Sequence, residues 1–182
     1  MNSIPEALMR PVSRRQLLQA GSAASAAWCL NGVAFFIPNK AAAQEGRAQP
    51  AIKTVVNFDA GVWQQLLASG PRPAAYVFTT SYCPSCPAVV AQLAQHIRRQ
   101  GRQVTLAAVL MDVVGDAALA NLHHYKGITQ VFAFDGFEPA IRHAVDPNWP
   151  NVTPYTVLVS RSGQLQRVIG PPDPSLLQRW LS

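Results

Sequence analysis

The stretch TTSYCPSCPAVV, residues Thr79–Val90, holds two cysteines with two residues between them and a proline after each. The run AAYVFTT (74–80) ahead of the pair is apolar throughout, which predicts a strand buried on both faces. After it, CPAVVAQLAQHIRRQG has apolar side chains at a period near 3.6, which predicts a helix ending at Gly101. Cys83 and Cys86 therefore lie between a buried strand and a helix, and can form a redox couple, half of a metal site or a structural staple.

Predicted strands and helices alternate along the rest of the chain. Strands are expected at IKTVVNF (52–58), QVTLAAVLM (103–111) and ITQVFAF (128–134). Helices are expected at DAGVWQQLLASG (59–70), GDAALANLHHYKG (115–127), FEPAIRHAV (137–145) and PSLLQRWL (174–181). YTVLVSRSG and QLQRVIG, joined by a Ser-Gly turn, predict a β-hairpin. This order predicts an α/β fold whose mainly parallel sheet gains antiparallel strands from the hairpin.

The first 43 residues read as an export signal. SRRQLL (13–18) is followed by a weakly apolar stretch and then by the small residues Ala41-Ala42-Ala43. The paired arginines resemble the twin-arginine signal, and we expect cleavage after Ala43. A retained membrane anchor is the alternative. Cys29 falls in this leader, so the processed chain keeps cysteines only in CPSC, in a compartment that permits disulfides.

Charge and size limit the classes of protein. The 182 residues suit one domain, expected at residues 44–182, and 49% of them are hydrophobic, which excludes a disordered chain. The net charge of +6 is partly due to the leader. The one later basic run, Arg98, Arg99 and Arg102, ends a predicted helix, where cations complement the helix dipole. We therefore expect no binding of nucleic acid.

The position of Cys83 favours a reactive thiolate. We expect it at or just before the first helical turn, where unpaired N–H groups and the helix dipole stabilise an anion. The pKa of thiols in such motifs falls from about 8.5 to between roughly 3.5 and 7.5. Pro84 is expected in the first turn, and Pro87 lacks the N–H that would bond the carbonyl of Cys83. We expect this open turn to leave Cys83 exposed and Cys86 shielded.

Metal binding and a purely structural disulfide remain alternatives. A structural zinc site commonly needs four ligands, and CPSC supplies two. His123 and His124 are adjacent, so on a helix they would point about 100° apart and make poor joint ligands. A copper or zinc carrier would use Cys83, Cys86 and one histidine. A staple across so short a loop would remove little chain entropy.

With these residues in place, the sequence resembles a thioredoxin-fold protein. CPSC after a buried strand matches the active-site loop of that family, and Val152-Thr153-Pro154 before YTVLV matches the position of its cis-proline. The resemblance implies a three-layer fold, with a central mixed sheet flanked by helices. The segment of about 40 residues between Met111 and Pro154 is similar to the insertion of the TlpA-like group of exported thiol reductases.

The resemblance also implies roles for residues outside CPSC. The backbone of Thr153 would pair with an extended substrate segment, and a cis Pro154 would present that edge. Tyr82 stands where many relatives have tryptophan. Tyr82 and Trp149 are candidates for an apolar rim, with ordinary packing as the alternative. Val77 occupies the place of the buried acid that assists proton transfer in thioredoxin, and no acidic residue is assigned beside the cysteines.

Taken together, these features predict a periplasmic thiol:disulfide oxidoreductase with Cys83 and Cys86 as its catalytic pair. We expect a reductant, because Pro84 and Ser85, which tune the loop, add no charge that would further stabilise the thiolate. Expected partners are protein dithiols or disulfides and a membrane or periplasmic electron donor. We expect no cofactor or metal, and membrane contact only through an uncleaved leader. The alternatives are a copper or zinc chaperone using the same cysteines, and a disulfide oxidant or isomerase.

Overall fold

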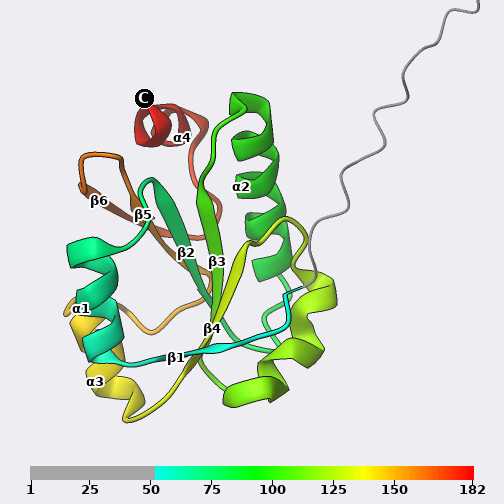
Figure 1. The fold of residues 1–182 in the computed structure, drawn as a ribbon, viewed down its shortest axis with the longest axis vertical. Helices are drawn as coiled ribbons and strands as arrows, with labels where there is room; N and C mark the ends of the chain where they lie inside the picture. The colour runs from blue at the N-terminus through cyan, green and yellow to red at the C-terminus, as the bar shows by residue number, and fades with distance from the viewer. Residues whose placement is uncertain (1–51) are drawn as a thin grey trace, which may run out of the picture. The chain divides into compact units, whose positions relative to one another are not determined.

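The computed structural model describes residues 52–182, and these form an α/β fold with a mixed sheet between helices (Figure 1). The predicted leader, its cleavage site after Ala43 and Cys29 lie outside the described residues. Within 52–182, no helix has the length and apolar character needed to cross a membrane.

The sheet has six strands in the order β1-β4-β3-β2-β5-β6. Their bounds are β1 Val56–Phe58, β2 Ala74–Thr79, β3 Thr105–Leu110, β4 Gln130–Phe134, β5 Tyr155–Val159 and β6 Leu165–Ile169. β1, β4, β3 and β2 run parallel, and β5 and β6 follow as an antiparallel hairpin beside β2. The predicted parallel sheet with a closing hairpin is confirmed. The first strand is shorter than expected, because only Val56–Phe58 pair with β4.

Helices cover both faces of the sheet (Figure 1). Their bounds are α1 Ala60–Ser69, α2 Cys86–Gln100, α3 Glu138–Val145 and α4 Pro174–Leu181, together with the 3₁₀ helix η1 Gly115–His124. Each lies where the sequence predicts a helix. The 3₁₀ form of η1 was not foreseen, because apolar spacing does not separate the two helical pitches over so short a segment.

Alternating side chains of the central strands build two separate cores. Ala75 and Val77 of β2 face a core shared with α2, α4 and both cysteines, which we call the disulfide-side core. Tyr76 and Phe78 face the opposite, aromatic core, where rings such as Phe58 and Phe78 meet edge to face at 5.6 Å between centroids. Every residue of β2 is buried, so the prediction of a strand covered on both faces is confirmed.

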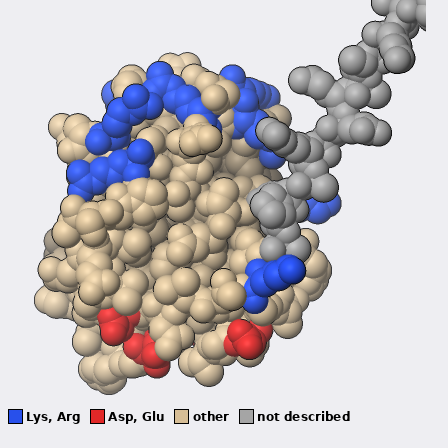
Figure 2. Space-filling view, in the orientation of Figure 1, with Lys and Arg blue, Asp and Glu red and all other residues tan. Residues whose placement is uncertain are grey.

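Charged side chains are unevenly distributed over the surface. In Figure 2, Lys and Arg side chains gather along the top of the view, where the ends of α2 and α4 lie in Figure 1. The Asp and Glu side chains visible there lie along the lower edge. Other Lys and Arg side chains lie at the right of the view, some of them close to an acidic side chain, so the two signs of charge are only partly separated along the direction in which α2 runs.

Candidate functional site

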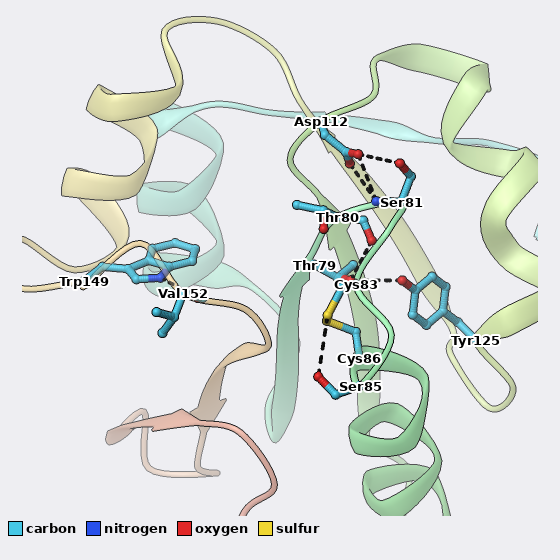
Figure 3. Close-up of a disulfide and its surroundings, with 10 residues drawn as sticks. All are labelled: Thr79, Thr80, Ser81, Cys83, Ser85, Cys86, Asp112, Tyr125, Trp149 and Val152. Carbon is cyan, nitrogen blue, oxygen red and sulfur yellow. Dashed lines mark hydrogen bonds between the residues drawn. A yellow bond between two sulfur atoms is a disulfide. The ribbon is translucent and has the colours of Figure 1, made fainter.

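Cys83 and Cys86 form a disulfide in the loop between β2 and α2 (Figure 3). β2 ends at Thr79 and α2 begins at Cys86, so the loop leaves the carboxyl end of a central strand and enters the amino end of a helix. The two Cα atoms are 5.6 Å apart. The predicted placement between a buried strand and a helix is confirmed.

The two sulfurs differ in accessibility, although less than expected. Cys86 is fully buried and Cys83 is 8% exposed. The expectation that Cys83 stands exposed is wrong in degree, because in the disulfide both side chains pack into the disulfide-side core. Cys83 is nevertheless the more accessible of the two to an incoming thiol.

α2 begins later than the sequence suggested. Ser85 is its N-cap, so Pro84 precedes the helix and the expectation that Pro84 lies in the first turn is wrong. Pro87 occupies the first turn instead, where its missing N–H costs no helical bond. The first regular bond runs from the amide of Val89 to the carbonyl of Ser85, at 3.4 Å.

The amino end of α2 is electrostatically open toward the sulfurs. The side chain of Ser85 makes no capping bond, and the first turn contains no acidic residue. Arg98 and Arg99 stand in the last turn, at the negative pole. The Oγ of Ser85 lies 3.9 Å from the Sγ of Cys83, within reach of a weak contact to sulfur. This arrangement favours an anion at the position of Cys83.

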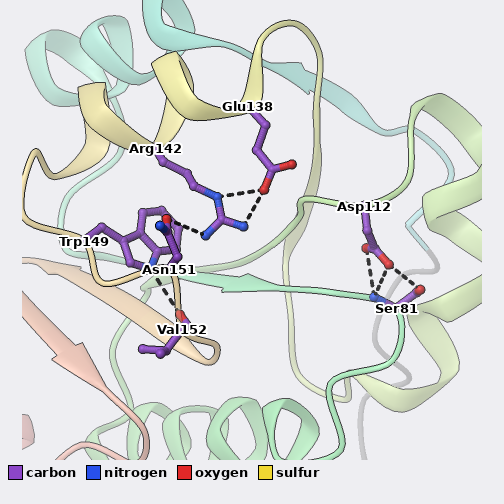
Figure 4. Close-up of polar contacts among 7 residues, drawn as sticks. All are labelled: Ser81, Asp112, Glu138, Arg142, Trp149, Asn151 and Val152. Carbon is purple, nitrogen blue, oxygen red and sulfur yellow. Dashed lines mark hydrogen bonds and ion pairs between the residues drawn. The ribbon is translucent and has the colours of Figure 1, made fainter.

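Asp112 is a residue of the site that the sequence argument missed. Its carboxylate accepts hydrogen bonds from the backbone N–H of Ser81, at 2.9 and 3.0 Å, and from the Ser81 hydroxyl (Figures 3 and 4). Ser81 is two residues before Cys83, so Asp112 holds the start of the disulfide loop. The signal was available, because Asp112 follows β3 and the carboxyl ends of neighbouring parallel strands meet at one edge.

A second polar contact fixes the end of β2. The hydroxyls of Thr79 and Tyr125 are 2.9 Å apart (Figure 3). Burial raises the pKa of Tyr125, the bond to Thr79 opposes this, and the charge of Asp112 adds to the rise, so the phenol is neutral at ordinary pH. Val77 lies in the disulfide-side core. Among the described residues no Asp or Glu is buried, so no buried carboxylate lies beside the cysteines.

Pro154 lies directly before β5, which pairs with β2. Tyr155 is opposite Phe78, so Pro154 is brought to the end of β2 from which the disulfide loop departs. The Thr153–Pro154 peptide bond is cis. Thr153 is half-buried and Pro154 is buried. Tyr82, immediately before Cys83, is 78% exposed, which suits the predicted rim.

Trp149 packs into the protein rather than forming an exposed rim. It belongs to the aromatic core, and its ring stacks on that of Tyr155 with centroids 4.2 Å apart. Its indole N–H donates to the carbonyl of Val152 at 3.1 Å (Figure 4). Arg142, which pairs with Glu138, lies over the ring at 5.0 Å from the centroid. Ordinary packing is therefore the role of Trp149, and it fixes the segment before Pro154.

The described residues contain no grouping of three or more His, Cys, Asp or Glu side chains placed to hold a metal ion. His123 and His124 are both exposed. Their rings do not point apart as expected but lie 3.7 Å apart between centroids. The expectation assumed rigid helical directions for the side chains, and rotation about the side-chain bonds of exposed residues overrides them.

No protein-family model matches the sequence, and no curated protein matches it. Solved structures do match, among them a secreted disulfide oxidoreductase of Mycobacterium tuberculosis homologous to E. coli DsbE. It is 20% identical, with 59% of this chain and 76% of that chain covered and a TM-score of 0.42.

Two further solved structures are similar to the chain. A thiol:disulfide interchange protein of the thioredoxin family from Chlorobium tepidum is 14% identical, with 71% and 91% of the two chains covered and a TM-score of 0.46. A thio-disulfide isomerase from Thermus thermophilus is 20% identical, with 62% and 79% covered and a TM-score of 0.45. The chain has a thioredoxin-like α/β fold with a disulfide at Cys-x-x-Cys spacing.

Proposed function

We propose that this chain is an exported thiol:disulfide oxidoreductase that reduces protein disulfides through Cys83 and Cys86. The observation that carries the proposal is the disulfide at the amino end of α2, with Cys83 as its more accessible sulfur. A structural staple would need neither this helix end nor a difference in access between its sulfurs. The protein uses no cofactor in this proposal, because two thiols suffice to carry the electrons.

The proposed cycle starts from the dithiol. The Cys83 thiolate attacks one sulfur of a substrate disulfide, that bond breaks, and the leaving sulfur departs as a thiolate that takes up a proton. The Cys86 thiol then loses its proton and attacks the Sγ of Cys83. The mixed disulfide breaks, the second substrate thiol is released, and the Cys83–Cys86 disulfide forms. Two electrons pass to the substrate, and a periplasmic or membrane electron donor restores the dithiol.

The helix end supports the choice of Cys83 as nucleophile. Because α2 has no acidic residue in its first turn and no side-chain cap, its N–H groups and dipole remain available to a thiolate. Pro84 keeps Cys83 outside the helix, and Ser85 lies close enough to contact the sulfur. We assign these two residues to tuning of the loop.

Substrate binding is proposed at the segment before β5. The backbone of Thr153, with Pro154 beside it, would pair with an extended stretch of the substrate, and Tyr82 would contact its side chains. Three observations support this assignment. Pro154 borders the end of β2, Tyr82 is exposed next to Cys83, and Trp149 holds the carbonyl of Val152. The nearby pairing of Arg142 with Glu138 steadies the same segment from α3.

The direction of electron flow and the compartment complete the proposal. We infer a reductant of the TlpA-like group, exported by a twin-arginine signal cleaved after Ala43 and working in the periplasm. The absence of a positive charge between the two cysteines supports this direction. Such a charge would stabilise the thiolate further and make the reduced form a weaker reductant. An oxidant or isomerase is the alternative at the same site.

Two cysteine variants test the proposal. Cys83→Ala should abolish reduction of a protein disulfide, whereas Cys86→Ala should accumulate a mixed disulfide detectable by mass, since the resolving thiol is missing. Ser69→Ala, at the exposed end of α1, is the matched control and should retain turnover. Normal product release by Cys86→Ala would show that the roles are wrong. Protection of both thiols by stoichiometric Cu(I) or Zn(II), without disulfide exchange, would favour the metal chaperone instead.

A further inference from the structure

The end of the molecule opposite the disulfide is built from four chain segments. α2 starts at Cys86 and runs for 15 residues, which is about 22 Å, so its last turn lies far from the sulfurs. Thr105, at the start of β3, donates to the carbonyl of Pro73 at 3.2 Å. Arg102 donates to the carbonyl of Leu181 at the end of α4. Contacts between segments therefore fix this surface.

The turn of the β5–β6 hairpin belongs to the same end. Gly163 lies against Arg72, since a Cβ added at Gly163 would stand 2.5 Å from a guanidinium nitrogen of Arg72. Arg72 also donates to the carbonyl of Leu67, which orients its guanidinium. Arg72 and Arg102 are thus held by the backbone through single N–H groups. Each keeps further donors free, because a guanidinium carries five.

Exposed arginines occupy all four segments. We call them the basic end: Arg72, Arg98, Arg99, Arg102, Arg161 and Arg179. Among residues 52–182, the ion pairs join Arg142 to Glu138 and Arg167 to Asp146, so none involves the basic end. Of the acidic residues in that range, Asp173 is the N-cap of α4, and the others lie outside these segments: Asp59, Asp112, Asp116, Asp135, Glu138 and Asp146. On the face visible in Figure 2, most of the basic side chains lie toward this end, away from the acidic ones.

The basic end carries no exposed large hydrophobic side chain. Those of the described chain lie in other segments: Val56, Tyr82, Val114, Phe137, Val152 and Ile169. A pocket of about 520 Å³ lies between Arg72 and Arg102, and its lining includes the partly buried Ile97 and Val104. Protein interfaces usually bury a larger apolar core, so this surface suits a partner held mainly by charge. Exposed aromatic rings that could stack on nucleic acid bases are missing from the basic end, since Tyr82 and Phe137 follow β2 and β4 at the opposite end.

We propose that the basic end binds an anionic phospholipid surface. A bilayer presents a continuous negative plane, so it needs no shape complementarity and can meet arginines spread over four segments at once. Binding in this orientation holds the amino end of α2, with Cys83, on the side facing away from the lipid. The inference does not depend on the proposed redox function, because it rests on the arrangement of the arginines.

Vesicle binding by the full chain tests the proposal. Vesicles of phosphatidylcholine mixed with phosphatidylglycerol are compared with phosphatidylcholine alone at low and high salt. Each basic residue near an anionic surface adds to the free energy of binding. Arg99→Gln or Arg161→Gln alone should therefore lower the partition coefficient about fivefold. Combined with Arg98→Gln, the three changes should lower it about a hundredfold. Lys53→Gln, in the segment before β1, is the matched single-charge control and should bind as the unaltered chain does.

Several outcomes would overturn the proposal. These are failure of the unaltered chain to bind the mixed vesicles, equal binding by the triple variant, or an effect of Lys53→Gln as large as that of Arg99→Gln. Binding to phosphatidylcholine alone that ignores these arginines would assign the contact to another segment. Tighter, arginine-dependent binding to a DNA duplex at the same salt would assign the surface to nucleic acid. Urea unfolding of the triple variant, compared with that of the unaltered chain, checks that it is folded.

Discussion

Asp112 places a negative charge beside the loop that carries Cys83, the proposed nucleophile. It accepts hydrogen bonds from Ser81, two residues before Cys83, and so orders the loop while opposing a nearby thiolate. The amino end of α2 acts in the other direction. The reactivity of Cys83 in the reduced protein is therefore set by two opposed local fields, of which only the helix can be recognised from the spacing of the cysteines.

Asp112→Asn separates these effects. Removing the negative charge should lower the pKa of the Cys83 thiol, by up to about one unit, because the thiolate loses a repulsive neighbour. The pH dependence of alkylation of the reduced protein measures this. Asp116→Asn removes the same charge from the start of η1 and should change the thiol less. A raised pKa in Asp112→Asn would mean that ordering of the loop outweighs the charge.

Asp146 links the segment after α3 to the hairpin. Desolvation by burial would raise its pKa, but the hydroxyl of Tyr155, the amide of Asn148 and the charge of Arg167 together hold that pKa below its ordinary value of 3.8. Its carboxylate is thus bound more strongly in the folded state than in the unfolded state. The stability it contributes is complete above pH 3.8 and is lost as the pH falls through the lower, folded-state pKa.

Asp146→Asn should therefore lower the free energy of unfolding by about 1.5 to 3 kcal/mol at neutral pH, the usual range for a hydrogen bond to a charged group. The difference from the unaltered protein should shrink below pH 3.8. Urea unfolding at several pH values measures it. Tyr155→Phe removes the donor and keeps the ring, so it should reproduce the loss. A difference that persists in acid would contradict the argument.

At the scale of elements, the close approach of the segment after η1 to α2 depends on Gly127. Its φ is +95°, and a Cβ there would stand 2.4 Å from the Cβ of Ala94. Gly101, which ends α2, has a φ of +59° and open space around its Cα. The two glycines share the left-handed conformation and differ in crowding.

Substituting alanine at each glycine separates strain from crowding. Gly101→Ala should cost about 1 to 2 kcal/mol of unfolding free energy, from the backbone conformation alone. Gly127→Ala should cost about 1 to 3 kcal/mol more, because α2 must shift to admit the methyl group. Urea unfolding of both variants provides the comparison. Equal losses would show that α2 yields without cost.

Local patterns were sufficient for the elements and insufficient for the contacts between them. The apolar run 74–80 and the helical period after Cys86 predicted β2 and α2, because burial on two faces or on one stripe leaves a mark in the sequence. The contacts of Asp112 with Ser81 and of Trp149 with Val152 were not predicted, because the first depends on how the strands are ordered and the second on loop geometry. The start of α2 at Cys86 was not predicted either, because both Pro84 and Pro87 suit the first turn of a helix.

For the whole molecule, the direction of electron flow is tied to stability. When the disulfide stabilises the folded state, the oxidised form of the folded protein is favoured over the dithiol. The dithiol is then the better reductant. If the protein is a reductant, the oxidised form should unfold at a higher urea concentration than the dithiol form. Urea unfolding with and without dithiothreitol measures this. A more stable dithiol form would make the protein an oxidant.

Because the two cores are separate, only one of them should respond to a change between the disulfide and the dithiol. Trp180 packs in the layer that contains Cys83 and Cys86, whereas Trp63 and Trp149 pack on the far side of the sheet. A change between disulfide and dithiol should therefore alter the fluorescence of Trp180 and leave that of the other two nearly constant. In a chain of residues 44–182, replacing Trp63 and Trp149 by phenylalanine would leave the indole of Trp180, in α4, as an internal optical reporter of oxidation state.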